Sequence, residues 1–337
     1  MDYACLGRTG LKVSRLCLGT MVFGRWGNPD HDDCVRIIRR ALDEGINFID
    51  TANRYGMGES EEIVGKALKG RREEAVLATK VFMPGPGGLL DRGTSRRHIM
   101  LQIEESLRRL GTDWIDLYQI HRNDKDTPIE ETLSALTDCV RQGKVRYLGV
   151  STGSQPESRS MYFGGWQMVE SLWVSDRRNF ERFVSTQPPY SIFTREAERD
   201  IFPVCRAHGF GAIVWSPIEG GWLSGRYRKG KPAPADSRAK NDTEFGAFVA
   251  PNFDLTTPKA ARRLDAIEEL VGMANELDVS LARYATAWTL RNGAVTSAIV
   301  GARVMSQLED TLRAVDVKIP DPHMGRIDAL VTPGTNA

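Results

Sequence analysis

The chain has 337 residues, of which 41% are apolar and 26% are charged. This composition is that of an ordinary globular protein, and the length suits one large α/β domain or two small ones. The 45 Lys and Arg residues nearly cancel the 44 Asp and Glu residues, which leaves a formal charge of +1. Such a balance argues against a protein that coats nucleic-acid phosphates, but it permits a local basic pocket for a small anion.

The five cysteines are widely spaced and form no C-x-x-C pair, which argues against a zinc site or a disulfide framework. They favour a reducing compartment. The first residues, Met1–Cys5, lack the basic and apolar regions of a signal peptide. No apolar run approaches the roughly 20 residues of a membrane span. We therefore expect a cytoplasmic protein with neither a membrane nor a nucleic acid as partner.

The chain opens with a pattern typical of a β-hairpin, with strands at about 3–7 and 11–15 around Arg8-Thr9-Gly10. From residue 15 onward, short β-rich runs alternate with segments of helical spacing. The predicted strands are 15–19, 46–49, 75–79, 115–120, 145–150, 183–187, 211–215 and 297–300. The predicted helices are 33–44, 95–110, 129–141, 258–277 and 305–314.

Eight strands that alternate with helices form either an open doubly wound sheet or a closed barrel. A doubly wound dinucleotide-binding fold carries G-x-G-x-x-G after its first strand, but this chain has Gly19-Thr20-Met21-Val22-Phe23-Gly24 there. A later Gly209-Phe210-Gly211 precedes a strand instead of opening a helix. We therefore predict an α/β fold of the (β/α)₈ TIM-barrel type, with residues 1–337 forming a single domain.

A minimal barrel takes about 250 residues, which leaves about 90 for the hairpin, the tail and long rim loops. The longest loop, about 217–258, contains Gly220-Gly221 and Lys231-Pro232-Ala233-Pro234. Its few apolar residues indicate a mobile flap at the rim. A second loop, about 152–164, is rich in Ser, Gly and Pro.

Four ionisable side chains follow or end predicted strands. Asp50 ends the run Phe48-Ile49-Asp50, and Tyr55 comes five residues later; Lys80 and His121 follow the next two strands. Each residue taken alone fits an ordinary structural role, such as packing, helix capping or solvation. Because parallel barrel strands end at one rim, where barrel enzymes place their chemistry, we expect the four to form one active site.

These groups suit the reduction of a carbonyl by a nicotinamide hydride, because the developing alkoxide needs a proton. A free phenol titrates near 10, and a neighbouring ammonium favours the phenolate and lowers that pKa. Lys80 is expected to supply the ammonium, and Asp50 to hold Lys80 charged and fixed. His121 is expected to orient the carbonyl oxygen or to share in proton transfer.

Several separated motifs, spread over about Leu6 to Val315, together resemble the aldo-keto reductases. They are Gly45–Ala52 with Tyr55-Gly56 and Glu59-Ser60-Glu61, Thr79-Lys80, Asp116–His121, Gly143–Ser151, Gln187–Ser191, Trp215-Ser216-Pro217 and Ile299–Arg303. The resemblance implies an NADPH-dependent reductase of aldehydes or ketones with the tetrad Asp50, Tyr55, Lys80 and His121. It points to the branch that also includes bacterial oxidoreductases similar to potassium-channel β subunits.

The resemblance also implies a cofactor site. Ser151, Thr152 and Gln187 would surround the nicotinamide carboxamide, and Trp215 would stack on the ring. Thr20 and Met21 would touch the nicotinamide ribose, next to Asp50. The pyrophosphate and adenosine would lie on Ser216, Pro217, Ile218, Ser224, Arg226, Arg238, Gly301, Arg303, Gln307, Asp310 and Thr311. Arg303 and Arg238 favour NADPH over NADH, while Thr152 and Thr311 stand where many relatives carry Asn.

The substrate pocket is expected to include Trp26, Phe82 and Met83 beside Tyr55 and His121. The sequence leaves the carbonyl substrate and the formation of a homo-oligomer open. Two rival functions remain. A metal-dependent hydrolase would need several converging ligands, whereas only His121 among the five histidines ends a predicted strand, and no metal is expected. An NADPH-binding regulatory subunit resembling the potassium-channel β subunits, with weak activity, is the second alternative.

Overall fold

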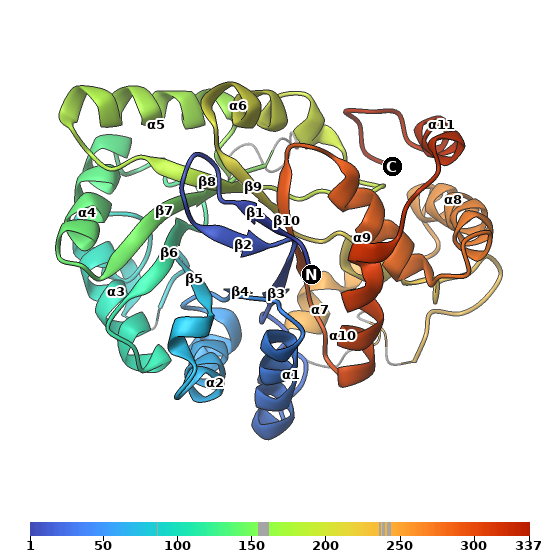
Figure 1. The fold of residues 1–337 in the computed structure, drawn as a ribbon, viewed down its shortest axis with the longest axis horizontal. Helices are drawn as coiled ribbons and strands as arrows, with labels where there is room; N and C mark the ends of the chain where they lie inside the picture. The colour runs from blue at the N-terminus through green and yellow to red at the C-terminus, as the bar shows by residue number, and fades with distance from the viewer. Residues whose placement is uncertain (86, 154–161, 236, 238–239, 241–243) are drawn as a thin grey trace.

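The computed structural model describes residues 1–85, 87–153, 162–235, 237, 240 and 244–337. Eight parallel strands close into a barrel in the order β10-β3-β4-β5-β6-β7-β8-β9, with helices packed around it (Figure 1). The strands are β3 (Leu16–Gly19), β4 (Phe48–Asp50), β5 (Val76–Val81), β6 (Ile115–Ile120), β7 (Val145–Ser151), β8 (Phe183–Gln187), β9 (Gly211–Val214) and β10 (Val295–Val300). The predicted (β/α)₈ barrel is confirmed.

The helices cover the outside of the barrel. They are α1 (His31–Asp43), α2 (Glu59–Leu68), α3 (Arg96–Leu110), α4 (Ile129–Arg141), α5 (Gly165–Arg178), α6 (Ile201–His208), α7 (Glu244–Val249), α8 (Pro258–Asn275), α9 (Leu281–Arg291), α10 (Met305–Leu312) and α11 (Asp321–Leu330). The five predicted helices are present within a few residues of their expected ends. Four barrel helices, α2, α5, α6 and α9, were not predicted, because their short or mixed apolar stripes give weak periodicity.

The predicted hairpin consists of β1 (Tyr3–Cys5) and β2 (Lys12–Ser14), paired antiparallel. It lies across the amino end of the barrel strands (Figure 1). Leu6 and Val13 of this hairpin belong to the apolar cluster inside the barrel, together with Phe48, Leu117 and Ile213. The amino end of the barrel is thereby closed, so a ligand can approach the strand ends only from the carboxyl rim.

The expectation of few apolar anchors in the loop at 217–258 was wrong. This segment contains η5 (Glu219–Ser224), α7 and η7 (Ala250–Phe253). Trp222, Tyr227 and Phe253 are buried and stack with ring centroids 5.0–5.8 Å apart. Phe253 lies far from Trp222 and Tyr227 along the segment, so the packing of the three rings could not be read from local apolar density.

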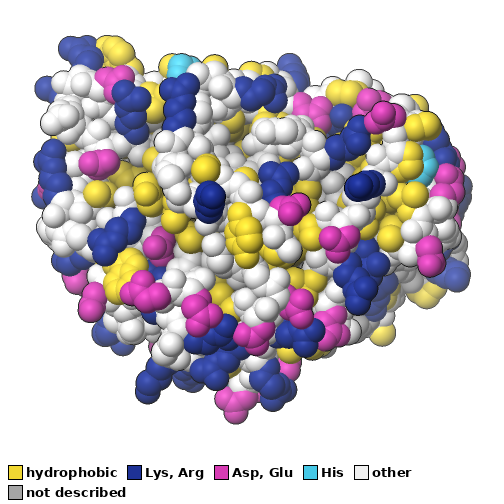
Figure 2. Space-filling model, in the orientation of Figure 1, with side chains coloured by type: hydrophobic (Ala, Val, Ile, Leu, Met, Phe, Trp, Pro, Cys, Tyr) yellow, Lys and Arg dark blue, Asp and Glu magenta, His cyan; other side chains and the backbone are white. Residues whose placement is uncertain are grey.

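The face that carries the hairpin shows acidic and basic side chains interspersed, without a large area of one sign (Figure 2). Within the described ranges, no helix is both long and apolar enough to span a membrane.

Two of the three aromatic or aliphatic side chains exposed on α5, Trp166 and Trp173, are more than half exposed. These side chains form the most apolar part of that helix's outer surface.

The hairpin predicts a sharp stability effect at Gly7. Gly7 has φ +58°, and an added Cβ would lie 2.5–2.9 Å from three backbone atoms of Val184, Gly209 and Gly211. Gly7→Ala should therefore lower the free energy of unfolding by at least about 2 kcal/mol. The matched control is Gly10→Ala, where no atom lies within 4 Å; it should change stability by less than about 0.5 kcal/mol. Denaturant unfolding measures both, and equal effects would contradict the prediction.

Candidate active site

The four predicted ionisable residues come together at the carboxyl rim of the barrel. Asp50 is the last residue of β4, and Lys80 lies near the end of β5. His121 follows β6 directly, and its backbone N–H donates to Val81 O at 2.9 Å. Tyr55 opens η1 (Tyr55–Gly58) in the loop after β4. Neighbouring parallel strands thus supply three of the groups, and a short turn returns the fourth to them.

Lys80 connects the acid to the phenol. Its Nζ is fully buried, donates to Asp50 Oδ1, and lies 3.1 Å from the hydroxyl of Tyr55. A third bond, 2.9 Å long, reaches Thr51 O. Three donors therefore meet three oxygen atoms, which satisfies the ammonium group inside the barrel.

Burial and charge oppose one another at this cluster. Burial raises the pKa of Tyr55, and the Lys80 ammonium opposes the rise without reversing it. Burial by itself lowers the pKa of Lys80, but the charges and hydrogen bonds of Asp50 and Tyr55 outweigh it, so that pKa is raised. Lys80 lowers the pKa of the phenol, as expected, but desolvation of the phenolate is the larger effect, so the net pKa of Tyr55 is raised. At neutral pH the cluster holds a protonated phenol and a charged ammonium.

His121 faces Tyr55 edge to face, with ring centroids 5.7 Å apart. Burial, followed by the positive charges of Lys80 and Arg122, holds the pKa of His121 well below its ordinary value. Its Nδ1 is buried and has no hydrogen-bond partner within the described ranges. A neutral imidazole beside the phenol can form a hydrogen bond to an oxygen atom of a bound molecule without adding charge.

Two glutamines complete the polar cluster, and sequence reasoning assigned no role to one of them. Gln119 of β6 and Gln187 of β8 each donate from Nε2 to Asp50 Oδ2, at 3.0 and 2.9 Å. Gln187 Nε2 also donates to Gln119 Oε1 at 3.1 Å. The available signal for Gln119 was a polar residue near the carboxyl end of the strand at 115–120, one residue from Ile120 and two from His121.

The residues predicted around the nicotinamide lie on adjoining strand ends. Ser151 Oγ donates to Gln187 O at 3.0 Å, and the hydroxyls of Thr152 and Thr186 are 2.7 Å apart. Trp215 follows β9, is half-buried, and exchanges backbone hydrogen bonds with Pro188 and Tyr190. These contacts bring Ser151, Thr152, Gln187 and Trp215 to one sector of the rim.

Thr20 and Met21 follow β3. The hydroxyl of Thr20 is fully buried, donates to Asp50 O at 3.1 Å and lies 2.8 Å from Ser60 Oγ. Thr20 therefore ties the end of β3 to that of β4, and this hydroxyl has partners within the protein. Met21 is half-buried at the same rim.

The residues predicted for the pyrophosphate and adenosine lie in two segments. Ser216, Pro217, Ile218, Ser224 and Arg226 belong to the segment after β9, whereas Arg238 lies outside the described residues. Gly301, Arg303, Gln307, Asp310 and Thr311 lie in or before α10. The backbone is open at Gly301, where an added Cβ would meet only Gly19 O, at 3.9 Å.

Three side chains of that second segment have partners within the protein. Gln307 Oε1 accepts from the backbone N–H of Arg303 at 2.8 Å, and the Thr311 hydroxyl donates to Gln307 O. Asp310 accepts from Arg283 Nη2 at 2.6 Å and from the Ser280 hydroxyl. These bonds stabilise the start of α10 and its contact with α9. The cofactor roles of Gln307, Asp310 and Thr311 stay predictions.

Of the residues predicted for the substrate pocket, Trp26 is placed beside Tyr55, and the pocket itself stays a prediction. Trp26 lies beside Tyr55, with ring centroids 6.1 Å apart, and Phe82 and Met83 follow β5, half-buried. The guanidinium of Arg122 lies over the ring of Tyr162, 4.4 Å from its centroid. Arg122 and Tyr162 were not predicted, since neither lies in a motif that marks a pocket.

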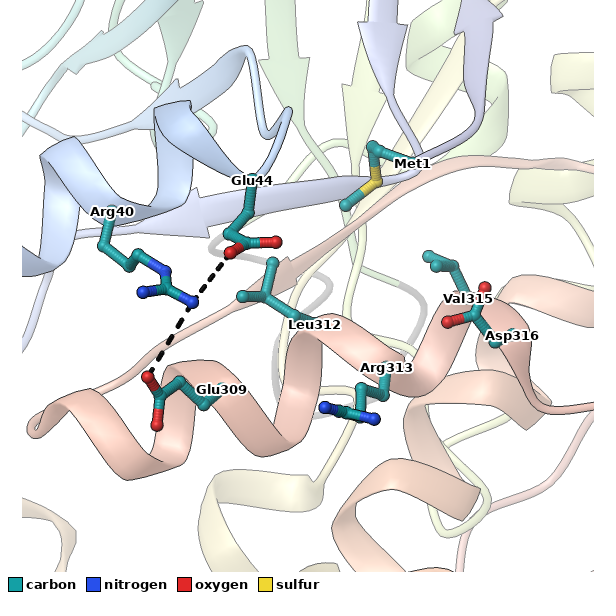
Figure 3. Close-up of a pocket in the computed structure, with 8 residues that line it drawn as sticks. All are labelled: Met1, Arg40, Glu44, Glu309, Leu312, Arg313, Val315 and Asp316. Atoms are coloured by element: carbon teal, nitrogen blue, oxygen red, sulfur yellow. Dashed lines mark ion pairs between the residues drawn. The ribbon is translucent and has the colours of Figure 1, made fainter.

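A surface hollow of about 500 Å³ lies between α1, α10 and the N-terminal residue, outside the barrel (Figure 3). Arg40 on its wall is paired with Glu44 at 2.7 Å, and none of the tetrad residues lines it. In the described ranges, no three His, Cys, Asp or Glu side chains come close enough together to hold a metal ion. Among the described residues, the cluster of Asp50, Tyr55, Lys80 and His121 at the rim is therefore the candidate active site.

Comparison with known proteins identifies the family of the chain. Residues 15–332 match the model of the aldo/keto reductase family. The chain belongs to this family. It is 40% identical to the uncharacterized oxidoreductase YrpG of Bacillus subtilis, over 95% of this chain and 92% of that protein. It is 36% identical to a probable voltage-gated potassium channel β subunit of Arabidopsis thaliana (94% and 92%), and 33% identical to the aldo-keto reductase YhdN of B. subtilis (92% and 87%).

The depressed pKa of His121 predicts a pH effect on stability. The unfolded imidazole titrates near 6.5, whereas the folded one resists protonation, so its contribution is present above about pH 6.5 and is lost as the pH falls below it. Relative to His121→Asn, the wild type should lose up to about 1.4 kcal/mol per pH unit between about pH 6.5 and 5. Denaturant unfolding over this range measures the difference. Parallel curves for the two proteins would contradict the assignment.

Proposed function

We propose that this member of the aldo/keto reductase family reduces an aldehyde or ketone to an alcohol with NADPH. One observation carries the proposal: Lys80 Nζ lies 3.1 Å from the Tyr55 hydroxyl and is paired with the buried Asp50. A protonated phenol beside a charged ammonium is suited to general acid catalysis. The pair lies at the carboxyl rim, which is the end of the barrel that the hairpin leaves open. The family membership supports an oxidoreductase activity.

NADPH, when bound, supplies the hydride that reduces the carbonyl carbon. The remaining steps belong to the protein. Tyr55 donates its proton to the carbonyl oxygen as negative charge develops there, and Lys80 stabilises the phenolate that is left. Asp50 keeps Lys80 charged and fixed in position. His121, as a neutral imidazole, hydrogen-bonds the same oxygen and orients the carbonyl toward Tyr55.

The described residues fit a nicotinamide dinucleotide. Gln187 Oε1 accepts no hydrogen bond from the described residues and is an acceptor at the rim, and the half-buried ring of Trp215 offers a flat apolar face beside it. The open backbone at Gly301 precedes α10 and suits a phosphate group. Arg303, two residues after Gly301, is the proposed reader of the 2′-phosphate and the basis for preferring NADPH over NADH.

A second candidate function is a regulatory subunit that binds NADPH with weak activity. Its support is the 36% identity to the probable channel β subunit. His121, as a polar neighbour of Tyr55, favours the enzyme. A panel of aldehydes and ketones, assayed by NADPH absorbance, separates the two: turnover with at least one carbonyl supports the reductase.

Five cysteines without a disulfide among them support a cytoplasmic location.

The acid role of Tyr55 predicts the effect of Tyr55→Phe. Loss of the hydroxyl should lower turnover by at least roughly 10²-fold, the scale of general acid catalysis, while NADPH binding stays near that of the wild type. The matched control is Tyr118→Phe, because Tyr118 is fully buried and its hydroxyl has no hydrogen-bond partner within the described ranges. Steady-state kinetics measure turnover, and a fully active Tyr55→Phe enzyme would remove Tyr55 from the acid role.

The proposed reading of the 2′-phosphate predicts the effect of Arg303→Ala. A charge-assisted contact to phosphate is stronger than a neutral hydrogen bond, so NADPH affinity should fall by roughly tenfold or more. NADH lacks the 2′-phosphate, and its affinity should change by less than about twofold. Fluorescence titration with each dinucleotide gives both dissociation constants. Equal losses would show that Arg303 does not discriminate between them.

A further inference from the structure

The polar cluster beneath the rim contains a hydrogen-bond arrangement whose direction is fixed by charge. Asp50, Lys80, Gln119 and Gln187 are all at most 3% exposed. Lys80 and Gln119 are direct neighbours in the pairing of β5 with β6. The cluster therefore lies inside the barrel, where solvent cannot replace a lost hydrogen bond.

The carboxylate determines which way each amide points. Asp50 is paired with Lys80, so its oxygens only accept, and both glutamines must present Nε2 to Oδ2. The Oε1 of Gln119 then faces Gln187 and accepts a hydrogen bond from Gln187 Nε2, at 3.1 Å. Both N–H bonds of the Gln187 amide are thus used within the protein. A group that approaches Gln187 from the rim meets only Oε1, which accepts.

The space for Gln119 depends on a glycine. Gly149 of β7 pairs with Gln119, and an added Cβ there would lie 3.0 Å from Gln119 Cγ and 2.7 Å from Ser185 Oγ. Because Gly149 has no side chain, Gln119 has room to contact both Asp50 and Gln187. The arrangement is therefore built into two adjacent strands, not into a flexible loop.

We propose that Gln119 is a positioning residue: by occupying the second N–H of Gln187, it restricts Gln187 to accepting a hydrogen bond from the amide N–H₂ of the nicotinamide. Asp50 is thereby shared between two tasks. One oxygen holds Lys80 beside Tyr55, and the other sets the hydrogen-bond direction at the cofactor. The inference rests on the proposed function, because it requires a nicotinamide dinucleotide at this rim.

The test compares NADP⁺ with its 3-acetylpyridine analogue, in which a methyl group replaces the amide nitrogen and removes the donor. Quenching of tryptophan fluorescence measures both dissociation constants without turnover. The wild type should bind NADP⁺ roughly three- to tenfold more tightly than the analogue, the range of one net hydrogen bond. In Gln119→Leu, the second N–H of Gln187 loses its partner and can donate to the carbonyl oxygen on the pyridine ring, which both dinucleotides carry. The ratio of the two dissociation constants should therefore fall below about two.

Two further variants complete the design. Gln102→Leu is the matched control, because Gln102 is a buried glutamine of α3 that bonds Asn53 and Asp91 instead of the rim cluster; its ratio should equal that of the wild type. Gln119→Met replaces Gln119→Leu if the latter does not fold. An unchanged ratio in the folded Gln119 variant, or a wild-type ratio near one, overturns the inference. Failure of the wild type to bind either dinucleotide overturns the proposed function itself.

Discussion

The buried ion pair between Asp50 and Lys80 is the interaction on which the site depends. Both side chains are almost completely buried, and a single unpaired charge there would be strongly destabilising. Each charge is satisfied by several partners: Lys80 by Asp50, Thr51 and Tyr55, and Asp50 by Lys80 and two glutamines. The pair therefore fixes the relative positions of strands β4, β5, β6 and β8 at the rim.

Closure of the amino end of the barrel determines the side from which a ligand reaches this ion pair. The hairpin fills the amino end with Leu6 and Val13, and the interior below the rim is packed with apolar side chains. Access to the ion pair is left to the carboxyl end, where the Tyr55 hydroxyl lies 3.1 Å from Lys80 Nζ and His121 lies beside Tyr55. The low polarity that raises the pKa of Tyr55 and lowers that of His121 is a consequence of the same packing. Protonated phenol and neutral imidazole are thus produced by burial more than by any single neighbour.

The stabilising role of several rim residues limits what each can contribute to binding. Thr20 is bonded to Ser60 and to the backbone of Asp50, and Asp310 is paired with Arg283. These contacts hold the ends of β3 and α10 within the protein itself. Gln187 and Gly301 differ, since one presents an amide oxygen and the other an open backbone. Specific recognition at this rim is therefore expected from few groups in fixed positions.

The sequence by itself determined the class of fold and selected the four ionisable side chains that the structure brings together at the rim. Alternation of β-rich runs with helical spacing, together with a first turn lacking G-x-G-x-x-G, was enough to predict a barrel, and strand ends were enough to select Asp50, Lys80 and His121. Such local signals exist because burial imposes a period on each element separately. The same signals were too weak for α2, α5, α6 and α9, and they missed the aromatic packing of Trp222, Tyr227 and Phe253.

Only the tertiary structure decided the balance of effects at the site. The net rise in the pKa of Tyr55, the engagement of Gln119 with Asp50, and the contact of Arg122 with Tyr162 all depend on distances between residues that are far apart along the chain. Desolvation and hydrogen-bond direction depend on everything that surrounds a group in space. A linear sequence identifies which groups are present, whereas closure of the barrel determines how far each is removed from water and which atoms it faces.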